Sequence, residues 1–213
     1  GEYLSRQPYD SEILVVDDGS EDDTAETARA AWPAVRLISY RPNRGKGHAV
    51  RAGMTAATGD YRVFYDADAS TPIEELEKLW PRFEDGADVV IGSRALPGSR
   101  IEVRQPWHRQ AMGRMFNRLE RLTGLTRFPD TQCGFKGFTA RACEIVFPRQ
   151  TVERYSFDAE LLYIAQRHGL RIDQVPVRWI NCPHTRVNAA TDSTRMLADL
   201  LAIRARALLG RYD

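Results

Sequence analysis

Short apolar runs alternate with stretches of helical period along the first 92 residues. The apolar runs lie at residues 12–16, 35–40, 61–65 and 87–92, and the segments between them predict helices at 22–32, 46–57 and 72–83. Nearly continuous apolar strands that alternate with helices are typical of a parallel sheet covered on both faces. This half of the chain therefore predicts an α/β fold with a mostly parallel, Rossmann-like sheet and helices on both faces.

The second half predicts longer helices and fewer strands. Helices are expected at 105–122, 156–168 and 191–209, a turn leading into a short strand at 130–139, and a strand at 172–179. No repeat, low-complexity tract or linker divides the chain. We therefore expect a single domain over residues 1–213.

Composition and charge exclude several classes of protein. Lys plus Arg number 30 and Asp plus Glu number 29 in 213 residues, a net charge of +1 that argues against a general nucleic-acid binder. The three cysteines are an odd number without C-x-x-C spacing, so a disulfide framework or a zinc ribbon is not expected, and a reducing compartment such as the cytoplasm is favoured. The chain has no run of about 18 apolar residues that would predict a membrane span.

Polar residues follow the predicted strands at the points where the strands end. Asp17 and Asp18 follow the first, Asp66 and Asp68 the third, and Arg94 the fourth. Each of these alone is typical of a helix cap or a turn. Because ligands of open parallel sheets collect at the carboxyl ends of the strands, their combination on consecutive junctions predicts a binding site there.

The Asp66-x-Asp68 pair is the most specific of these features. Side chains two residues apart reach one ion only if the chain turns between them, and carboxylates without His or Cys suit Mg²⁺ or Mn²⁺ that also binds phosphate. Arg44 and Lys46, in the loop after the second strand, could complement a diphosphate. The glycine-rich fingerprints of dinucleotide dehydrogenases and P-loop NTPases are absent.

Six motifs in this order resemble the family 2 glycosyltransferases of GT-A fold. They are VVDDGS at 15–20, NRGKG at 43–47, YDAD at 65–68, GSR at 92–94, DTQCGFK at 130–136 and RYSFDAELL at 154–162. The last two are particular to the dolichyl-phosphate or polyprenyl-phosphate β-glucosyltransferase branch, which is related to the polyprenyl-phosphate mannose synthases. The resemblance covers essentially the whole chain.

The resemblance implies roles for individual residues. Asp18 would contact the uracil and ribose of a nucleotide sugar, and the loop with Arg44, Gly45 and Lys46 would lie near the base or diphosphate. Asp66 and Asp68 would hold the metal with the diphosphate. Arg94 and Arg109 would hold the acceptor phosphate, and Arg186 would lie near the donor diphosphate. In the domain as a whole, residues 1–104 would bind the nucleotide sugar and the metal, and residues 105–213 the acceptor.

The implied activity is metal-dependent, inverting transfer of glucose from UDP-glucose to a dolichyl or polyprenyl phosphate. A phosphate monoester is largely dianionic at neutral pH, so it needs positioning more than a general base. Were the acceptor a hydroxyl, Asp158 or Glu160 would be the candidate bases. The alternatives are a mannosyltransferase that uses GDP-mannose, a family 2 enzyme with a soluble acceptor, and a non-catalytic nucleotide-binding module.

Two further expectations concern the surroundings of the domain. The family opens with an apolar strand that contacts the nucleotide and has no counterpart in this sequence, so we expect a further strand, supplied by a preceding segment, to complete the sheet. The helix at 105–122 is basic and amphipathic, which is typical either of an ordinary core-facing helix or of contact with an anionic membrane. The resemblance favours the membrane, at its cytoplasmic face.

Overall fold

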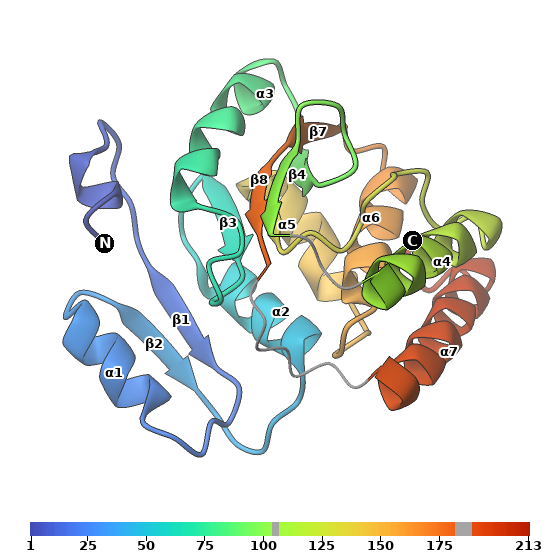
Figure 1. Cartoon of the computed structure of the whole chain (residues 1–213), viewed down its shortest axis with the longest axis horizontal. Coiled ribbons are helices and arrows are strands. Elements are labelled where there is room, and N and C mark those ends of the chain that lie inside the picture. Colours follow the sequence, from blue (N-terminus) through green and yellow to red (C-terminus); the bar gives the residue numbers. More distant parts are fainter. Residues whose placement is uncertain (104–106, 182–188) are drawn as a thin grey trace.

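A four-stranded mixed sheet lies at the centre of the computed structural model (Figure 1). Its strands, in spatial order, are β3 (Tyr61–Tyr65), β6 (Phe135–Thr139), β4 (Val89–Ser93) and β7 (Ile172–Pro176). Two parallel pairs accompany it: β1 (Leu14–Asp17) with β2 (Arg36–Ser39), and β5 (Arg100–Val103) with β8 (Arg178–Ile180). The structure describes the backbone of residues 1–103, 107–181 and 189–213, and the side chains of residues 1–103, 110–181 and 194–213.

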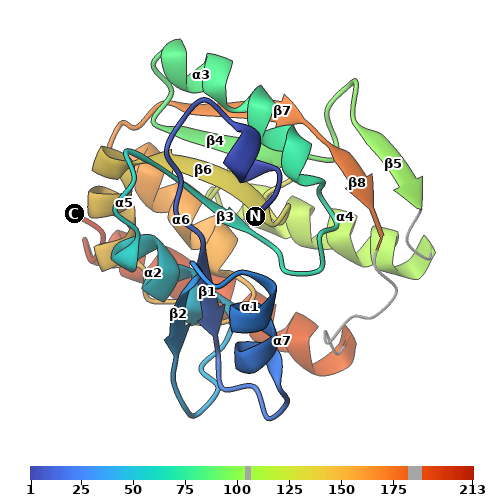
Figure 2. The ribbon, with the colours of Figure 1, turned by 90° about the vertical axis from the view of Figure 1, so that its left-hand side faces the viewer.

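Helices cover both faces of the central sheet, as Figure 2 shows from the side. They are α1 (Thr24–Ala31), α2 (Lys46–Ala56), α3 (Trp80–Glu84), α4 (Trp107–Leu122), α5 (Ala140–Val146), α6 (Phe157–Arg167) and α7 (Ala189–Leu208), with short 3₁₀ helices at Leu4–Arg6, Ile73–Lys78 and Phe147–Arg149. None of the helices in the described ranges is long and apolar enough to cross a membrane. The predicted α/β architecture is confirmed.

Strand alternation divides the core into two clusters. On β6, Phe138 packs with Phe64 of β3 and with the residues of α5 and α6, whereas Phe135 points to the opposite face and packs with Leu79 and Phe83. Successive side chains of a strand point to opposite faces, so Lys136 lies on the same face as Phe138, toward α6. A charged residue is thereby placed inside the larger apolar cluster.

β6 runs antiparallel to both of its neighbours, β3 and β4. The remaining pairings, β1 with β2, β4 with β7 and β5 with β8, are parallel. Among the described strands, parallel pairings thus outnumber antiparallel ones by three to two, as expected, and the reversed strand β6 lies inside the central sheet. That strand matters for the site because it begins directly beside the carboxyl end of β3.

Two predicted elements differ in detail from the structure, and the strand β5 was not predicted. The helix expected at 72–83 is divided into Ile73–Lys78 and α3, because Pro81 has no N–H to continue the helical hydrogen bonds. The strand expected at 172–179 divides at Pro176 into β7 and β8, which pair with different partners. β5 was not predicted because its four residues contain no apolar run. In the structure all four are exposed.

A cavity of about 3320 Å³ separates β1 from β3 and continues to the carboxyl ends of the strands. Helix α2 contacts both strands and forms part of its wall through Val50, Gly53 and Met54. Within the described ranges β1 pairs only with β2, and β3 pairs only with β6. The further strand expected from the resemblance stays a prediction.

Candidate functional site

Most of the residues singled out in the sequence line this one cavity. They are Asp18, Gly45, Lys46, Asp66, Asp68, Arg94 and Asp158. They come from the ends of β1, β3 and β4, from the start of α2 and from the first turn of α6. The topology therefore brings together side chains that are up to 140 positions apart in the sequence, from Asp18 to Asp158.

The chain turns between Asp66 and Asp68, as a shared cation would require. The Ala69 amide donates to the Asp66 carbonyl at 3.1 Å, and Ala69 has a positive φ of 53°. The Asp68 carboxylate accepts from the Ser70 amide at 2.9 Å, which fixes its side chain on the turn. Asp66 is partly buried and Asp68 is exposed to the cavity.

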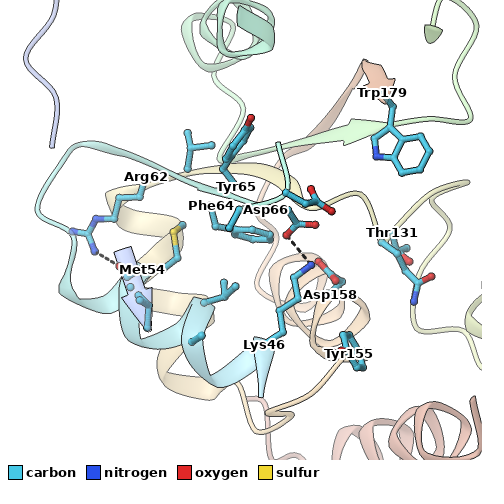
Figure 3. Close-up of a pocket in the computed structure, with 18 of the residues that line it drawn as sticks. Lys46, Met54, Arg62, Phe64, Tyr65, Asp66, Thr131, Tyr155, Asp158 and Trp179 are labelled. Carbon is cyan, nitrogen blue, oxygen red and sulfur yellow. Dashed lines mark hydrogen bonds and ion pairs between the residues drawn. The ribbon is translucent and has the colours of Figure 1, made fainter. Parts of the chain in front are cut away.

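Lys46 lies between two carboxylates, as Figure 3 shows. Its Nζ is 2.7 Å from Asp66 Oδ1, and Asp158 approaches it from α6. Burial alone would lower the pKa of the Lys46 ammonium, but the charges of Asp66 and Asp158 outweigh burial and raise it. Lys46 therefore remains a cation in this cavity.

Asp158 is buried and pairs with a buried lysine that was not singled out from the sequence. Lys136 Nζ lies 2.5 Å from Asp158 Oδ1. Burial raises the pKa of the Asp158 carboxyl, and the charges of Lys136 and Lys46 oppose that shift. Asp158 thus lies between two cations, Lys136 and Lys46.

Asp18 organises the loop that precedes α2. Its two carboxylate oxygens accept from the backbone amides of Arg44 at 2.8 Å and Gly45 at 2.7 Å, and its carbonyl accepts from the Asn43 side chain. Gly45 has a φ of 113°, and a Cβ there would come within 2.6 Å of the Glu153 carbonyl oxygen. The carboxylate thus holds the loop in a conformation that requires glycine.

Arg44 is directed away from this cavity. Its guanidinium forms an ion pair with Glu153, which also lies 3.4 Å from His48 Nδ1. Together with the 151–154 segment and α7, it lines a smaller cavity of about 460 Å³. The structure therefore separates Arg44 from Lys46, although the two are close in sequence.

Arg94 is fixed by a bidentate pair with Asp130. Its Nε and one terminal nitrogen donate to the two Asp130 oxygens at 2.8 Å each, and its backbone amide donates to the same carboxylate. The guanidinium also lies 5.4 Å from the centre of the Trp179 ring. Its charge holds the pKa of Asp130 below the usual value although burial acts in the opposite direction.

The two other acidic residues near the site differ in their roles. Glu160 accepts hydrogen bonds from the amides of Thr151 and Val152 and from the Thr151 and Tyr212 hydroxyls, so its contacts favour a structural role. Glu120 of α4 is fully buried, accepts from the Thr131 hydroxyl at 2.6 Å, and its other oxygen has no partner among the described residues. Burial raises the pKa of Glu120 to about 7.

Two of the predicted site residues cannot be placed. Arg186 and the side chain of Arg109 lie outside the described residues. Four further residues, which the sequence did not indicate as site residues, lie at the site: Gly134, Lys136, Asp130 and Trp179. The first three belong to the DTQCGFK motif at 130–136, which indicated the family but no individual role.

Asp66 and Asp68 have the donor chemistry for a divalent cation. In the described part of the chain no group of three or more His, Cys, Asp or Glu side chains could hold a metal by itself. Mg²⁺ in phosphate-binding sites is commonly held by one or two carboxylates together with substrate oxygens. Two carboxylates on one turn beside a lysine fit that arrangement.

Comparison with known proteins identifies the family. The model of glycosyl transferase family 2 matches residues 2–147. The chain belongs to this family. The resemblance expected from the motifs is thereby confirmed.

Curated relatives place the chain in one branch of glycosyl transferase family 2. It is 39% identical over 191 residues to dolichyl-phosphate beta-glucosyltransferase ALG5C of Trichomonas vaginalis, covering 83% of this chain and 56% of that protein. It is 34% identical to the dolichyl-phosphate beta-glucosyltransferases of Saccharomyces cerevisiae and Homo sapiens, covering 94% of this chain and 66% and 65% of those proteins. The chain thus spans a little more than half to two thirds of their length.

A solved structure supports the same fold. Glucosyl-3-phosphoglycerate synthase from Mycobacterium tuberculosis, crystallised with UDP, matches with a TM-score of 0.64 and 24% identity, covering 92% of this chain and 69% of that chain. The same enzyme was also crystallised with Mn²⁺ and UDP-glucose, and that structure matches with a TM-score of 0.61. These similarities establish the fold of this family 2 chain.

Proposed function

We propose that this chain forms the catalytic part of a metal-dependent, inverting glucosyltransferase that moves glucose from UDP-glucose to a dolichyl or polyprenyl phosphate. The observation that carries the proposal is its 32–39% identity, over 83–95% of its length, to dolichyl-phosphate beta-glucosyltransferases. The position of Asp18, Lys46, Asp66 and Asp68 around one cavity agrees with it. Residues 1–104 would bind donor and metal, and residues 105–213 the acceptor.

Asp66 and Asp68 would hold Mg²⁺ or Mn²⁺ together with the donor diphosphate. A cation held there would supply positive charge to offset the negative charge that develops on the departing UDP. Lys46 would share this task, since it carries a positive charge beside Asp66. Asp18 would contact the uridine, with the backbone of the loop at Arg44 and Gly45 that it holds, whereas the Arg44 side chain is engaged by Glu153. Arg186 would complete the contacts with the diphosphate.

Arg94 and Arg109 would bind the phosphate of the acceptor. Asp130 and Trp179 hold the Arg94 guanidinium on two sides, so little of its side-chain entropy would be lost on binding. An acceptor phosphate that is already dianionic attacks without a general base. With such an acceptor, Asp158 would serve to hold the charges of Lys46 and Lys136 in position within the site. It would act as a general base only if the acceptor were a hydroxyl.

Helices α4 and α7 would contact the membrane that contains the lipid. The two helices contact each other, and their exposed apolar residues are Met115, Leu122, Leu197, Leu201 and Leu208. Arg114, Arg118 and Arg121 are exposed on α4, whereas its acidic residue, Glu120, is buried. Exposed leucines with arginines suit an anionic interface, which we propose to be the cytoplasmic face of a membrane.

The decisive experiment combines donor binding with an acceptor assay. Affinities for UDP-glucose, GDP-mannose and UDP alone are measured by calorimetry with and without Mn²⁺, and transfer of labelled sugar is measured to polyprenyl phosphate in detergent and to a soluble hydroxyl acceptor. We expect Mn²⁺-dependent binding of UDP-glucose and transfer to the lipid. Three other results would contradict the proposal. Preference for GDP-mannose would indicate a mannosyltransferase, transfer only to the soluble acceptor would indicate a family 2 enzyme with a soluble acceptor, and nucleotide binding without transfer would indicate a non-catalytic module.

Matched variants locate the metal in the same experiment. Asp68→Asn removes a charge on the turn, and Asp60→Asn removes an exposed charge at the opposite end of β3. We expect only Asp68→Asn to abolish the effect of Mn²⁺ on donor affinity. An equal effect of Mn²⁺ on both variants would contradict the assignment.

A further inference from the structure

A lysine lies in the middle of the apolar core, where an ammonium group is rarely found. Lys136 is fully buried, and its Nζ lies 5.2 Å from the centre of the Phe64 ring. In the sheet it pairs with Phe64 of β3 on one side and with Ile91 of β4 on the other. Burying a charge in such surroundings is costly unless it is paired and hydrogen-bonded.

Two partners compensate the charge of Lys136. Its Nζ donates to Asp158 Oδ1 at 2.5 Å and to the Cys133 carbonyl oxygen at 2.5 Å. The first contact joins β6 to the first turn of α6, and the second fixes the ammonium against the turn that precedes β6. Asp158 is itself only 4% exposed, so neither charge can be satisfied by bulk water.

The pair continues into the donor site as a row of alternating charges. Its order is Asp66, Lys46, Asp158 and Lys136, from the carboxyl end of β3 to the core. Lys46 faces both carboxylates but makes its ion pair with Asp66. Asp158 already has a cation in Lys136, so it does not require Lys46 as its direct partner.

We propose that Lys136 is a positioning residue of the donor site, which satisfies Asp158 and thereby leaves Lys46 for Asp66 and the donor diphosphate. The diphosphate part of this statement rests on the proposed function. Without Lys136, the buried Asp158 carboxylate has Lys46 as the neighbouring cation. Lys46 then turns from Asp66 to Asp158 and is lost to the donor.

The test compares Lys136→Met with the double variant Lys136→Met/Asp158→Asn. The single variant leaves Asp158 charged, so we expect UDP-glucose affinity in Mn²⁺ to fall about ten- to a hundredfold, as for a lost hydrogen bond to a charged group. The double variant removes the charge that attracts Lys46, so we expect most of the affinity to return. A double variant that binds donor as weakly as the single variant would overturn the proposal.

Lys78→Met is the matched control for loss of a lysine ion pair. Lys78 pairs with Glu75 at 2.6 Å and donates to the Pro176 carbonyl at 3.0 Å, and it does not line the cavity. We expect this variant to keep wild-type donor affinity whatever its thermal stability. If donor affinity falls in parallel with thermal stability in all the variants, Lys136 has only a structural role, and the proposal is overturned.

Ligand-free crystal structures separate this inference from the proposed function. In Lys136→Met we expect Lys46 Nζ within ion-pair distance of Asp158 rather than Asp66, and in the double variant we expect it on Asp66. Lys46 remaining on Asp66 in the single variant would contradict the inference even if UDP-glucose binds. If the wild type does not bind UDP-glucose, the proposed function fails, and the partner of Lys46 in these structures still decides the role of Lys136.

Discussion

Gly134 provides the space in which the Asp66 carboxylate lies. A Cβ built on Gly134 would come within 1.9 Å of Asp66 Oδ2 and 2.1 Å of its Cγ. The Asp66 amide also donates to the Gly134 carbonyl at 3.1 Å. The turn before the antiparallel strand β6 thus sets the position of a residue at the end of β3, and any side chain at position 134 would displace that carboxylate.

Gly134→Ala should therefore weaken metal-dependent donor binding without disrupting the fold. The added methyl group moves the Asp66 carboxylate from its place and separates it from Lys46. We expect UDP-glucose affinity in Mn²⁺ to fall by about tenfold or more, since each factor of ten corresponds to only about 1.4 kcal/mol. Calorimetric titration with and without Mn²⁺ measures the change.

Gly137→Ala is the control for this substitution, three residues along the same segment. A Cβ there would come within 2.9 Å of the Phe83 ring, on the face of the sheet away from Asp66. We expect lower thermal stability with unchanged donor affinity. Equal donor affinities of Gly134→Ala and the wild type would show that Asp66 can bind its ligands from another position.

Asp18→Asn should weaken donor binding by loosening the loop before α2. The carboxylate accepts from two backbone amides, and an asparagine side chain has one oxygen acceptor in place of two. We expect affinity for UDP-glucose to fall about tenfold and protease cleavage at residues 43–45 to increase. Weaker binding without faster cleavage would indicate that Asp18 acts only by touching the nucleotide.

Arg94→Lys should affect the acceptor and spare the donor. Lysine keeps the charge beside Asp130 but loses the planar fork, so it cannot hold both Asp130 and a phosphate in the same geometry. We expect the KM for polyprenyl phosphate to rise about tenfold at saturating donor. Arg171→Lys is the control, because Arg171 also contacts a carboxylate, that of Asp173, through two nitrogens.

Kinetics with varied lipid phosphate check this expectation. Arg94→Ala is the less informative variant, because it leaves the buried Asp130 carboxylate without its partner and is expected to destabilise the fold by about 3–5 kcal/mol. An equal rise in KM for donor and acceptor in Arg94→Lys would mean that Arg94 supports the whole site rather than the acceptor.

The pairing of the strands predicts unequal backbone protection. All five residues of β4 are buried, and β4 has partners on both sides, whereas among the described residues β1 pairs only with β2 and faces the large cavity. Unpaired strand edges open more easily. For residues 1–213 by themselves, native-state hydrogen exchange should therefore show faster exchange in β1 and β2 than in β4, and similar protection in the two regions would contradict the separation of β1 from β3. A longer protein that supplies the further strand should show higher protection of β1.

The ends of the parallel strands could be predicted from the sequence because their pattern is local. Asp18, Asp66 and Arg94 each follow an apolar run directly, so the general geometry of parallel sheets brings them to one edge. The turn at Asp66 also follows from the sequence, because two carboxylates two positions apart reach one ion only if the chain turns between them. The mostly parallel order of the sheet follows from the alternation of strands and helices.

What the sequence could not indicate depends on contacts between distant segments. Lys136 interrupts the apolar pattern of a short strand, and only its antiparallel position between β3 and β4 places it in the core beside Asp158. Gly134 is an ordinary turn residue until Asp66 is packed against it. Asp130 and Arg94 are 36 positions apart, and no local pattern predicts their pairing.

Glu120→Gln tests the role of the buried Glu120 carboxyl on α4. Burial raises the pKa of Glu120 from the ordinary 4.5 to about 7 in the folded protein. Between these values the folded state binds more protons than the unfolded state, so this carboxyl makes the free energy of unfolding decrease as pH rises from about 4.5 to about 7. Above pH 7 the loss is complete and amounts to roughly 3 kcal/mol, at 1.36 kcal/mol for each pKa unit.

Glutamine is neutral at every pH and still accepts from the Thr131 hydroxyl, so it removes this dependence. We expect Glu120→Gln to be more stable than the wild type at pH 8, by about 1–3 kcal/mol, and about equal to it at pH 4.5. Urea denaturation at a series of pH values measures both. A stability difference that stays constant from pH 4.5 to 8 would mean that Glu120 does not change its protonation in this range. It would then be charged throughout in its buried position on α4, where the positive charge of Lys136 favours the ionised form.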